Sequence, residues 1–194
     1  MAQISFKKQD GKIIVTTYYN RRFASKARNL RGQWDSSKKA WIFDESVEEY
    51  VKQALLDVFG VTGETPYETC SLLIKDFTAW ESRGEVELFG RTVARAFGRD
   101  TGAKLGDDII WISGSYGSGG SAKNWTTEIK DGIFEIQDFP LERTKFDDVR
   151  KAVEDGWCEI KVNKKKRSRE EIESEIATLK SKLSELEEEL KNCE

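Results

Sequence analysis

The chain has 194 residues, of which 38% are hydrophobic and 35% are charged, and its net charge is −3. It contains no histidine, which excludes every Ser-His or Cys-His nucleophile and removes the usual general base and the usual zinc ligand. We therefore expect a protein that is not an enzyme and that uses no metal or other cofactor.

The cysteines and the hydropathy pattern bear on the compartment. Cys70, Cys158 and Cys193 are odd in number, lie far apart and have no metal-binding spacing. Unpaired thiols of this kind are typical of a reducing environment. The chain also has no apolar run of about 18 residues, the length that indicates a transmembrane helix. These features predict a soluble, cytoplasmic protein without a membrane partner.

Residues 1–60 are expected to form two strands, a helix, two more strands and a second helix. Asp10-Gly11 supplies the positive φ angles of a tight turn between the first two strands. Asn20 is a candidate N-cap for the first helix. Ser46 begins a capping box for the second helix, which an apolar stripe carries to Gly60.

Basic and aromatic side chains are concentrated in residues 18–43. Residues 1–43 carry ten Lys and Arg against two Asp and Glu, whereas residues 61–160 carry twelve against nineteen. A basic patch of this kind indicates a site for a polyanion, although a solvated face without a ligand is the alternative. The candidate phosphate contacts are Arg21, Arg22, Lys26, Arg28, Arg31, Lys38 and Lys39.

Trp34 and Trp41 lie on either side of the polar turn in this basic segment. We predict that both are mainly core residues, because a module of this size has few other large side chains to fill its interior. The alternative for Trp34 is an exposed platform on which a base stacks.

The same segment resembles a known family. The pattern consists of Tyr19-Asn20 before a basic helix, Gly32-Gln33-Trp34-Asp35, a Lys-rich turn, Trp41-Ile42-Phe43 and a helix opened by Ser46. It is similar to the HARP domain of annealing helicases and its phage and bacterial relatives, over residues 3–59. The resemblance implies binding to structured DNA, commonly at junctions of single and double strands. The helicase motor is missing, so the resemblance implies binding alone.

Residues 67–163 are predicted to form a β-rich domain with one helix, because apolar residues there recur with a period of two. Asp131-Gly132 predicts a further tight hairpin. The glycine-rich residues 114–123 predict a mobile loop, since they lack the Gly-Lys-Ser/Thr of a phosphate-binding loop.

The β-rich domain adds three candidate nucleic-acid contacts. Lys123 ends the glycine-rich segment. Arg91 and Arg95 are expected on one face of an extended segment, followed by Arg99. They form either a row that tracks a nucleic-acid backbone or charges on a solvated sheet face. The candidates added here are Arg91, Arg95 and Lys123.

Residues 164–194 are predicted to form a basic junction and a coiled-coil helix. Apolar residues alternate at spacings of four and three, which is a heptad seam. The seam predicts a parallel homodimer, with a trimer or a helix docked on its own chain as alternatives. The seam residues are Ile172, Ile176, Leu179, Leu183, Leu186 and Leu190.

The sequence thus predicts an α+β fold: a ββαββα module over residues 1–60, a β-rich domain over residues 67–163 and a coiled-coil helix over residues 164–194. The favoured function is a non-enzymatic, dimeric DNA-binding protein that recognises structured or single-strand-containing DNA through its basic module. The alternative is a phage or mobile-element protein that inhibits a host nuclease or defence complex by protein contacts. DNA and RNA are not distinguished by the sequence.

Overall fold

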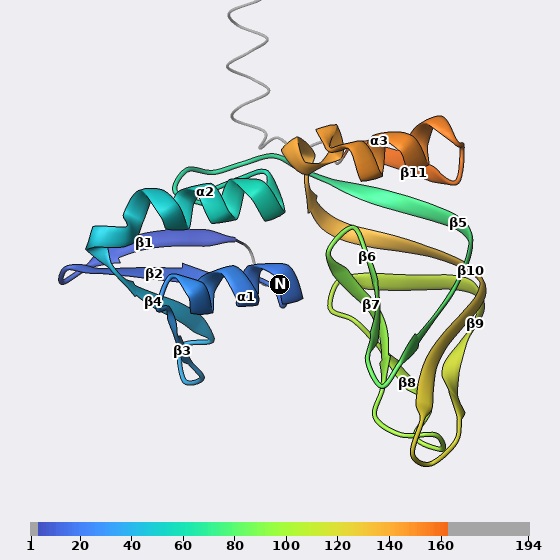
Figure 1. Cartoon of the computed structure of the whole chain (residues 1–194). Helices are drawn as coiled ribbons and strands as arrows, with labels where there is room; N and C mark the ends of the chain where they lie inside the picture. The colour runs from blue at the N-terminus through green and yellow to red at the C-terminus, as the bar shows by residue number, and fades with distance from the viewer. Residues whose placement is uncertain (1–3, 163–194) are drawn as a thin grey trace, which may run out of the picture. The chain divides into compact units, whose positions relative to one another are not determined.

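The computed structural model describes residues 4–162 (Figure 1). The predicted basic junction and coiled-coil seam, from Ile172 to Leu190, lie outside the described residues. The structure therefore gives no support to the coiled-coil helix that was part of the predicted fold class.

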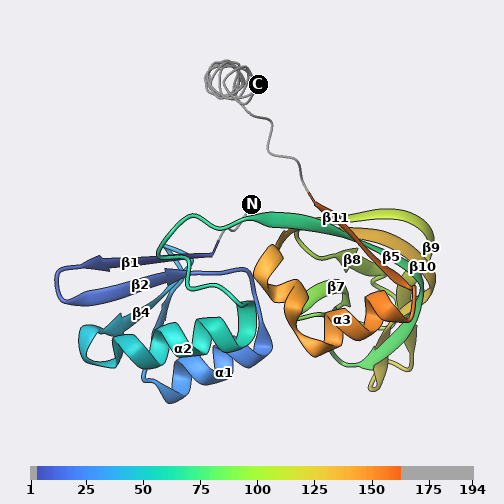
Figure 2. The ribbon, with the colours of Figure 1, turned by 90° about the horizontal axis from the view of Figure 1, so that it is seen from above.

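Residues 4–62, here called the N-terminal module, form one antiparallel sheet and two α-helices. The strand order is β1-β2-β4-β3. Helices α1 and α2 lie side by side and cover one face of the sheet (Figures 1 and 2). The elements are β1 (Ser5–Gln9), β2 (Lys12–Thr16), α1 (Arg21–Asn29), β3 (Gln33–Asp35), β4 (Ala40–Asp44), the 3-10 turn η1 (Glu45–Val47) and α2 (Glu48–Phe59).

Local signals explain the first half of this module. Asp10 and Gly11 have φ angles of 52° and 69°, so the predicted tight turn between β1 and β2 is confirmed. Asn20 is the N-cap of α1, as predicted, and its Oδ1 accepts a hydrogen bond from the Phe23 backbone N–H at 2.8 Å. The cap satisfies one of the backbone donors that a helix start leaves free.

The start of the second helix differs from the prediction. Asp44, rather than Ser46, accepts the capping hydrogen bond, and it caps the 3-10 turn η1. Helix α2 then begins at Glu48 without a side-chain cap. The expected ββαββα order is therefore not matched, because η1 intervenes between β4 and α2.

Residues 69–162, here called the β-rich region, contain two antiparallel sheets and a short helix. The first sheet has the order β11-β5-β10-β9 and the second has the order β6-β7-β8. The elements are β5 (Thr69–Ser82), β6 (Glu85–Leu88), β7 (Arg91–Ala96), β8 (Ala103–Leu105), β9 (Ile109–Gly120), β10 (Trp125–Pro140), the 3-10 turn η2 (Leu141–Lys145), α3 (Asp147–Glu154) and β11 (Cys158–Val162).

Two sequence predictions for this region are wrong. Asp131-Gly132 is not a hairpin turn but an irregularity within β10, where the register shifts against both neighbours. A reversal there is excluded because β10 is paired with β5 on one side and with β9 on the other. Residues 114–120 are not a loop but the second half of β9, since residues 115–120 pair with residues 125–130 of β10.

The predicted α+β class is also wrong. Strands make up 49% of the described residues, which makes the fold mostly β. The described residues contain three α-helices, and none of them is long and apolar enough to cross a membrane. The excess of strand comes from β5, β9 and β10, whose lengths of 14, 12 and 16 residues exceed what the local pattern predicted.

Buried polar contacts join the hydrophobic core of the N-terminal module to that of the β-rich region. Arg143 is 7% exposed, and its Nε donates to the carbonyl of Val58 at 3.2 Å. The same guanidinium forms two hydrogen bonds to Asp148, at 2.6 and 2.5 Å. Tyr67, which packs against the N-terminal core, accepts a hydrogen bond at its Oη from the Ile4 backbone N–H at 2.8 Å. The bond from Arg143 to Val58 thus satisfies a polar group where the two cores meet.

Asn20 makes a second contact across this junction. Its Nδ2 donates to the carbonyl of Gly90 at 2.9 Å, and the side chain is 6% exposed. We expect Asn20→Ala to lower the free energy of unfolding by about 2–3 kcal/mol, because it removes the cap and leaves the Gly90 carbonyl unpaired. Asn20→Ser retains a capping oxygen but cannot reach Gly90. Its free energy of unfolding, measured in urea, should therefore fall by about half as much. Equal losses for the two variants would show that the cap contributes nothing.

Candidate functional site

A groove lies between α1 and the β3–β4 hairpin. Its volume of about 490 Å³ is within the range of small-molecule sites in proteins. The wall is mostly aromatic and apolar, and one cation, Arg28, contributes to it. The lining residues are Thr17, Tyr18, Tyr19, Asn20, Phe23, Ala24, Arg28, Gly32, Trp34 and Trp41.

Gly32 allows α1 and β3 to lie close together beside this groove. A Cβ atom at Gly32 would overlap the ring of Phe43 and would lie 2.9 Å from the carbonyl oxygen of Ala27. The Gly32 backbone N–H donates to that carbonyl at 2.8 Å. The glycine of the motif therefore brings the hairpin back against the helix, and the two together form the groove.

The two tryptophans of the hairpin have different environments. Trp41 is 7% exposed, which confirms its predicted core position, but Trp34 is 50% exposed and its predicted core position is wrong. The rings meet edge to face, with centroids 5.5 Å apart. Trp34 lies on β3, which is the edge strand of its sheet, so only one side of the indole has a neighbouring strand. Trp34 is one of the residues that line the groove.

A cation and a second exposed ring complete the wall. The guanidinium carbon of Arg28 lies 5.8 Å from the centroid of the Trp41 ring, within the range of a cation–π contact. Tyr19 is 56% exposed. The groove thus presents flat aromatic faces beside a positive charge, a combination that suits stacking of a planar ring that carries or adjoins an anion.

More cations lie next to the groove, on the chain that leads into the hairpin and on its turn. Arg31, Lys38 and Lys39 are exposed, and none of them forms an ion pair with another residue in 4–162. Asp35 holds the turn, because its Oδ1 accepts hydrogen bonds from the Ser37 hydroxyl, the Ser37 N–H and the Lys38 N–H. These bonds, that of the Ser37 hydroxyl first, lower the pKa of Asp35. The hydrogen bonds therefore stabilise the backbone of the turn that carries the two lysines.

Comparison of the chain with protein-family models, curated proteins and solved structures finds no match. The function of the groove is therefore inferred from its own chemistry. That chemistry is a half-exposed indole and phenol beside Arg28, with Arg31 and the two lysines of the turn nearby.

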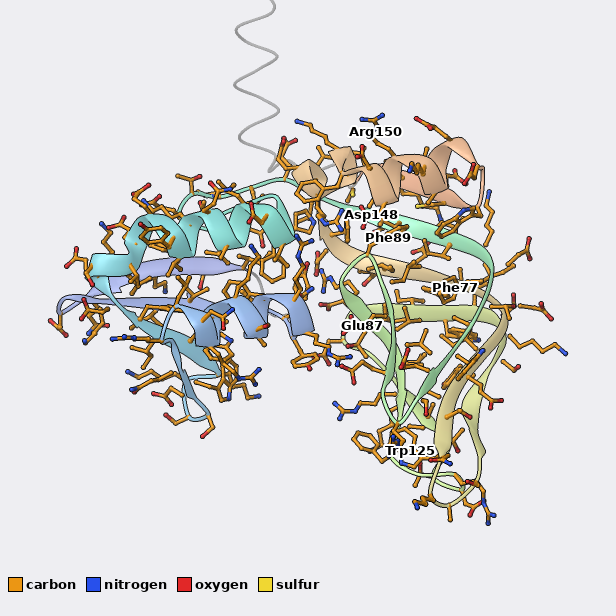
Figure 3. The ribbon with its side chains drawn as sticks, viewed as in Figure 1. Phe77, Glu87, Phe89, Trp125, Asp148 and Arg150 are labelled. Carbon is orange, nitrogen blue, oxygen red and sulfur yellow. The ribbon has the colours of Figure 1, made fainter. Side chains whose placement is uncertain are left out.

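Three of the predicted phosphate contacts on α1 lie next to acidic groups instead. Lys26 Nζ lies 2.7 Å from a carboxylate oxygen of Asp57 on α2. This hydrogen bond is the main reason that the pKa of Asp57 is lowered, and the charge of Arg22 adds to the effect. Arg21 borders a separate polar pocket with Glu81, Glu85 and Glu87, of which Glu87 is labelled in Figure 3. Arg21, Arg22 and Lys26 are therefore partly neutralised.

The predicted row of arginines on β7 does not form. Arg91 is 3% exposed and donates hydrogen bonds to the carbonyls of Gln137 and Asp138, so it is excluded as a phosphate contact. Arg95 is exposed, because the register shift between β6 and β7 inserts Val93 and changes which side chains share a face. Lys123 lies in the exposed β9–β10 turn and is not among the residues that line the groove.

Sequence reasoning missed Tyr18 and Tyr19 as parts of the site. Both precede the Asn20 cap and line the groove. The one local signal for them is their position directly before a basic helix. Tyr18 itself is 6% exposed and packs edge to face on Phe59, so Tyr19 is the member of the pair with an accessible ring.

Proposed function

We propose that this chain is a non-enzymatic DNA-binding protein that holds an unpaired base in the groove between α1 and the β3–β4 hairpin. The observation that carries the proposal is the half-exposed indole of Trp34 in a groove that also contains Arg28 and Tyr19. Stacking on an aromatic face tolerates every base, because every base has a π face. The exposed cations Arg31, Lys38 and Lys39 supply phosphate contacts.

This arrangement favours single strands and junctions over duplex DNA. A base inside a duplex is stacked on both sides, so it reaches an aromatic groove only after it has been unstacked. Strands that are already unpaired avoid that cost. The same preference is implied by the resemblance of residues 3–59 to HARP domains, whose matching residues include Tyr19, Trp34 and Trp41 of the groove.

The phosphate contacts are tested by a salt series. Replacement of Arg28, Arg31, Lys38 and Lys39 by glutamine is expected to weaken the binding of single-stranded and forked DNA. The slope of log K against log salt should fall by about 0.7 for each lost single-strand contact. Fluorescence anisotropy with labelled oligonucleotides at several salt concentrations measures both quantities.

The matched control removes the same charge elsewhere. Lys130, Lys145, Arg150 and Lys151 are exposed cations of the β-rich region, and their replacement by glutamine should leave the slope unchanged. If both variants lose the same slope, net charge rather than the groove determines binding. If wild-type protein binds no DNA at low salt, the proposed function is wrong.

A second candidate function is favoured by a separate observation. Ile110 and Ile112 are 45% and 54% exposed and share one face of β9, and neighbouring exposed apolar side chains suit a protein contact. The candidate is a protein-interaction factor that inhibits another protein, such as a nuclease or defence complex. Its affinity for that partner would depend weakly on salt, and substitutions in the Trp34 groove would not affect it.

A further inference from the structure

A second groove lies on the β-rich region and shares a wall with the first. Its volume is about 360 Å³, and Tyr18 and Tyr19 border it as they border the Trp34 groove. The side that belongs to the β-rich region contributes Arg95, Phe97 and Lys104. The two grooves are therefore neighbours that meet at the Tyr18-Tyr19 pair.

We propose that a single strand of DNA continues from the Trp34 groove across Tyr19 into this second groove, where Phe97 stacks a further base. The inference rests on the proposed function, because it extends the same strand. It assigns to the β-rich region a part in nucleic-acid binding. The three rings that bases would meet in turn are Trp34, Tyr19 and Phe97.

The second groove repeats the chemistry of the first. Phe97 is 60% exposed, although phenylalanine is ordinarily a core residue. The guanidinium carbon of Arg95 lies 5.1 Å from the centroid of its ring, as Arg28 lies over Trp41 in the first groove. Lys104 is exposed on the neighbouring strand β8. A half-exposed ring beside cations again suits a base together with its phosphate.

The charges around Tyr19 also favour a path for the strand into the second groove. Tyr19 borders a third, polar pocket in which three acids, Glu81, Glu85 and Glu87, outnumber two cations, Arg21 and Arg83. Burial and the charge of Glu85 raise the pKa of Glu87. The acids in excess there disfavour phosphates, whereas the second groove has two exposed cations, Arg95 and Lys104, against one acid, Asp107. Glu85 lies 3.7 Å from Arg95 and offsets part of its charge, which leaves Lys104 as the stronger phosphate contact.

The inference is tested by the dependence of affinity on strand length. Full-length protein is titrated with oligothymidylates of about 4 to about 16 nucleotides, the range of single-strand site sizes. Wild-type affinity should increase once the strand is long enough to reach the second groove. Phe97→Ala should bind long strands about tenfold more weakly than wild type, since one stacked base is lost, and should bind the shortest strands equally well. Lys104→Gln should reduce the salt slope for long strands alone.

Trp80→Ala is the matched control, because it removes an exposed ring outside both grooves, 70% exposed against 60% for Phe97, and should leave the affinity for every strand length unchanged. If Phe97→Ala binds every length as wild type does, the inference is overturned while the Trp34 groove keeps its proposed role. If wild-type protein binds neither short nor long strands, both the proposed function and the inference are wrong.

Discussion

Replacement of Arg91 by methionine is expected to lower the free energy of unfolding by about 3–5 kcal/mol, the usual cost of removing one partner from a buried ionic contact. Arg91 is 3% exposed, and one of its terminal nitrogens donates to the Asp138 carbonyl at 2.8 Å and to that of Gln137 at 3.4 Å. The other lies 3.4 Å from Asp108. Methionine has a similar length but no donor, so all three acceptors lose this partner. Urea unfolding measures the loss.

Arg91 also packs against the N-terminal module. Its guanidinium carbon lies 3.6 Å from the centroid of the Tyr18 ring, which is a close cation–π contact. Burial raises the pKa of Tyr18 to about 12, and the positive charge of Arg91 opposes this rise. Loss of the arginine therefore uncovers one face of the Tyr18 ring, and Tyr18 directly precedes Tyr19. We expect weaker DNA binding in addition to lower stability.

Arg95→Met is the control, because Arg95 is an exposed arginine on the same strand. Its effect on stability should be within about 0.5 kcal/mol, as for most surface substitutions. Equal stabilities of the two variants would mean that the contacts of Arg91 are offset by the cost of burying its charge. That cost is real, since Arg91 Nε is buried without a hydrogen-bond partner in the described part of the chain.

Replacement of Trp34 by alanine is expected to weaken the binding of single-stranded DNA by about 1–3 kcal/mol, which is the usual contribution of one base stacked on an aromatic side chain. The free energy of unfolding should change by about 1 kcal/mol or less, because the indole is already 50% exposed. Trp34→Phe should retain most of the affinity, since it retains a flat ring. Anisotropy titrations and urea unfolding of each variant separate the two effects.

Trp41→Ala gives the contrasting result. Trp41 is 7% exposed, and removal of a buried tryptophan costs about 3–5 kcal/mol of stability. A loss of this size for Trp34→Ala as well, with DNA affinity unchanged in the folded fraction, would restore the core role that the sequence predicted and would remove Trp34 from the binding site.

Several elements of this fold were predictable because their signals are local. The turn at Asp10-Gly11 and the cap at Asn20 depend on residues within a few positions of each other. The end of α2 at Gly60, which has a φ of 72°, depends on the freedom of glycine in the left-handed region. These features hold whatever the rest of the chain does.

The strands of the β-rich region were only partly predictable. Asp131-Gly132 carries the residue signature of a hairpin, yet the pairing of β10 with both β5 and β9 keeps the strand continuous. Similarly, Arg91 and Arg95 have the spacing of one strand face, but the strand is irregular at Val93, and Arg91 is buried whereas Arg95 is exposed. Pairing partners far away in the sequence determine such irregularities, and a local pattern carries no information about them.

The sequence by itself determined that the basic and aromatic residues of the N-terminal module lie together, since they are adjacent along the chain. The tertiary structure alone decided which of them are available. It buried Trp41 and exposed Trp34 on an edge strand, placed Asp57 against Lys26, and brought Tyr19 to a groove that also contains Phe97. The physical reason is that composition and spacing set which side chains are near one another in the chain, whereas exposure and ion pairing depend on elements that pack against them from elsewhere.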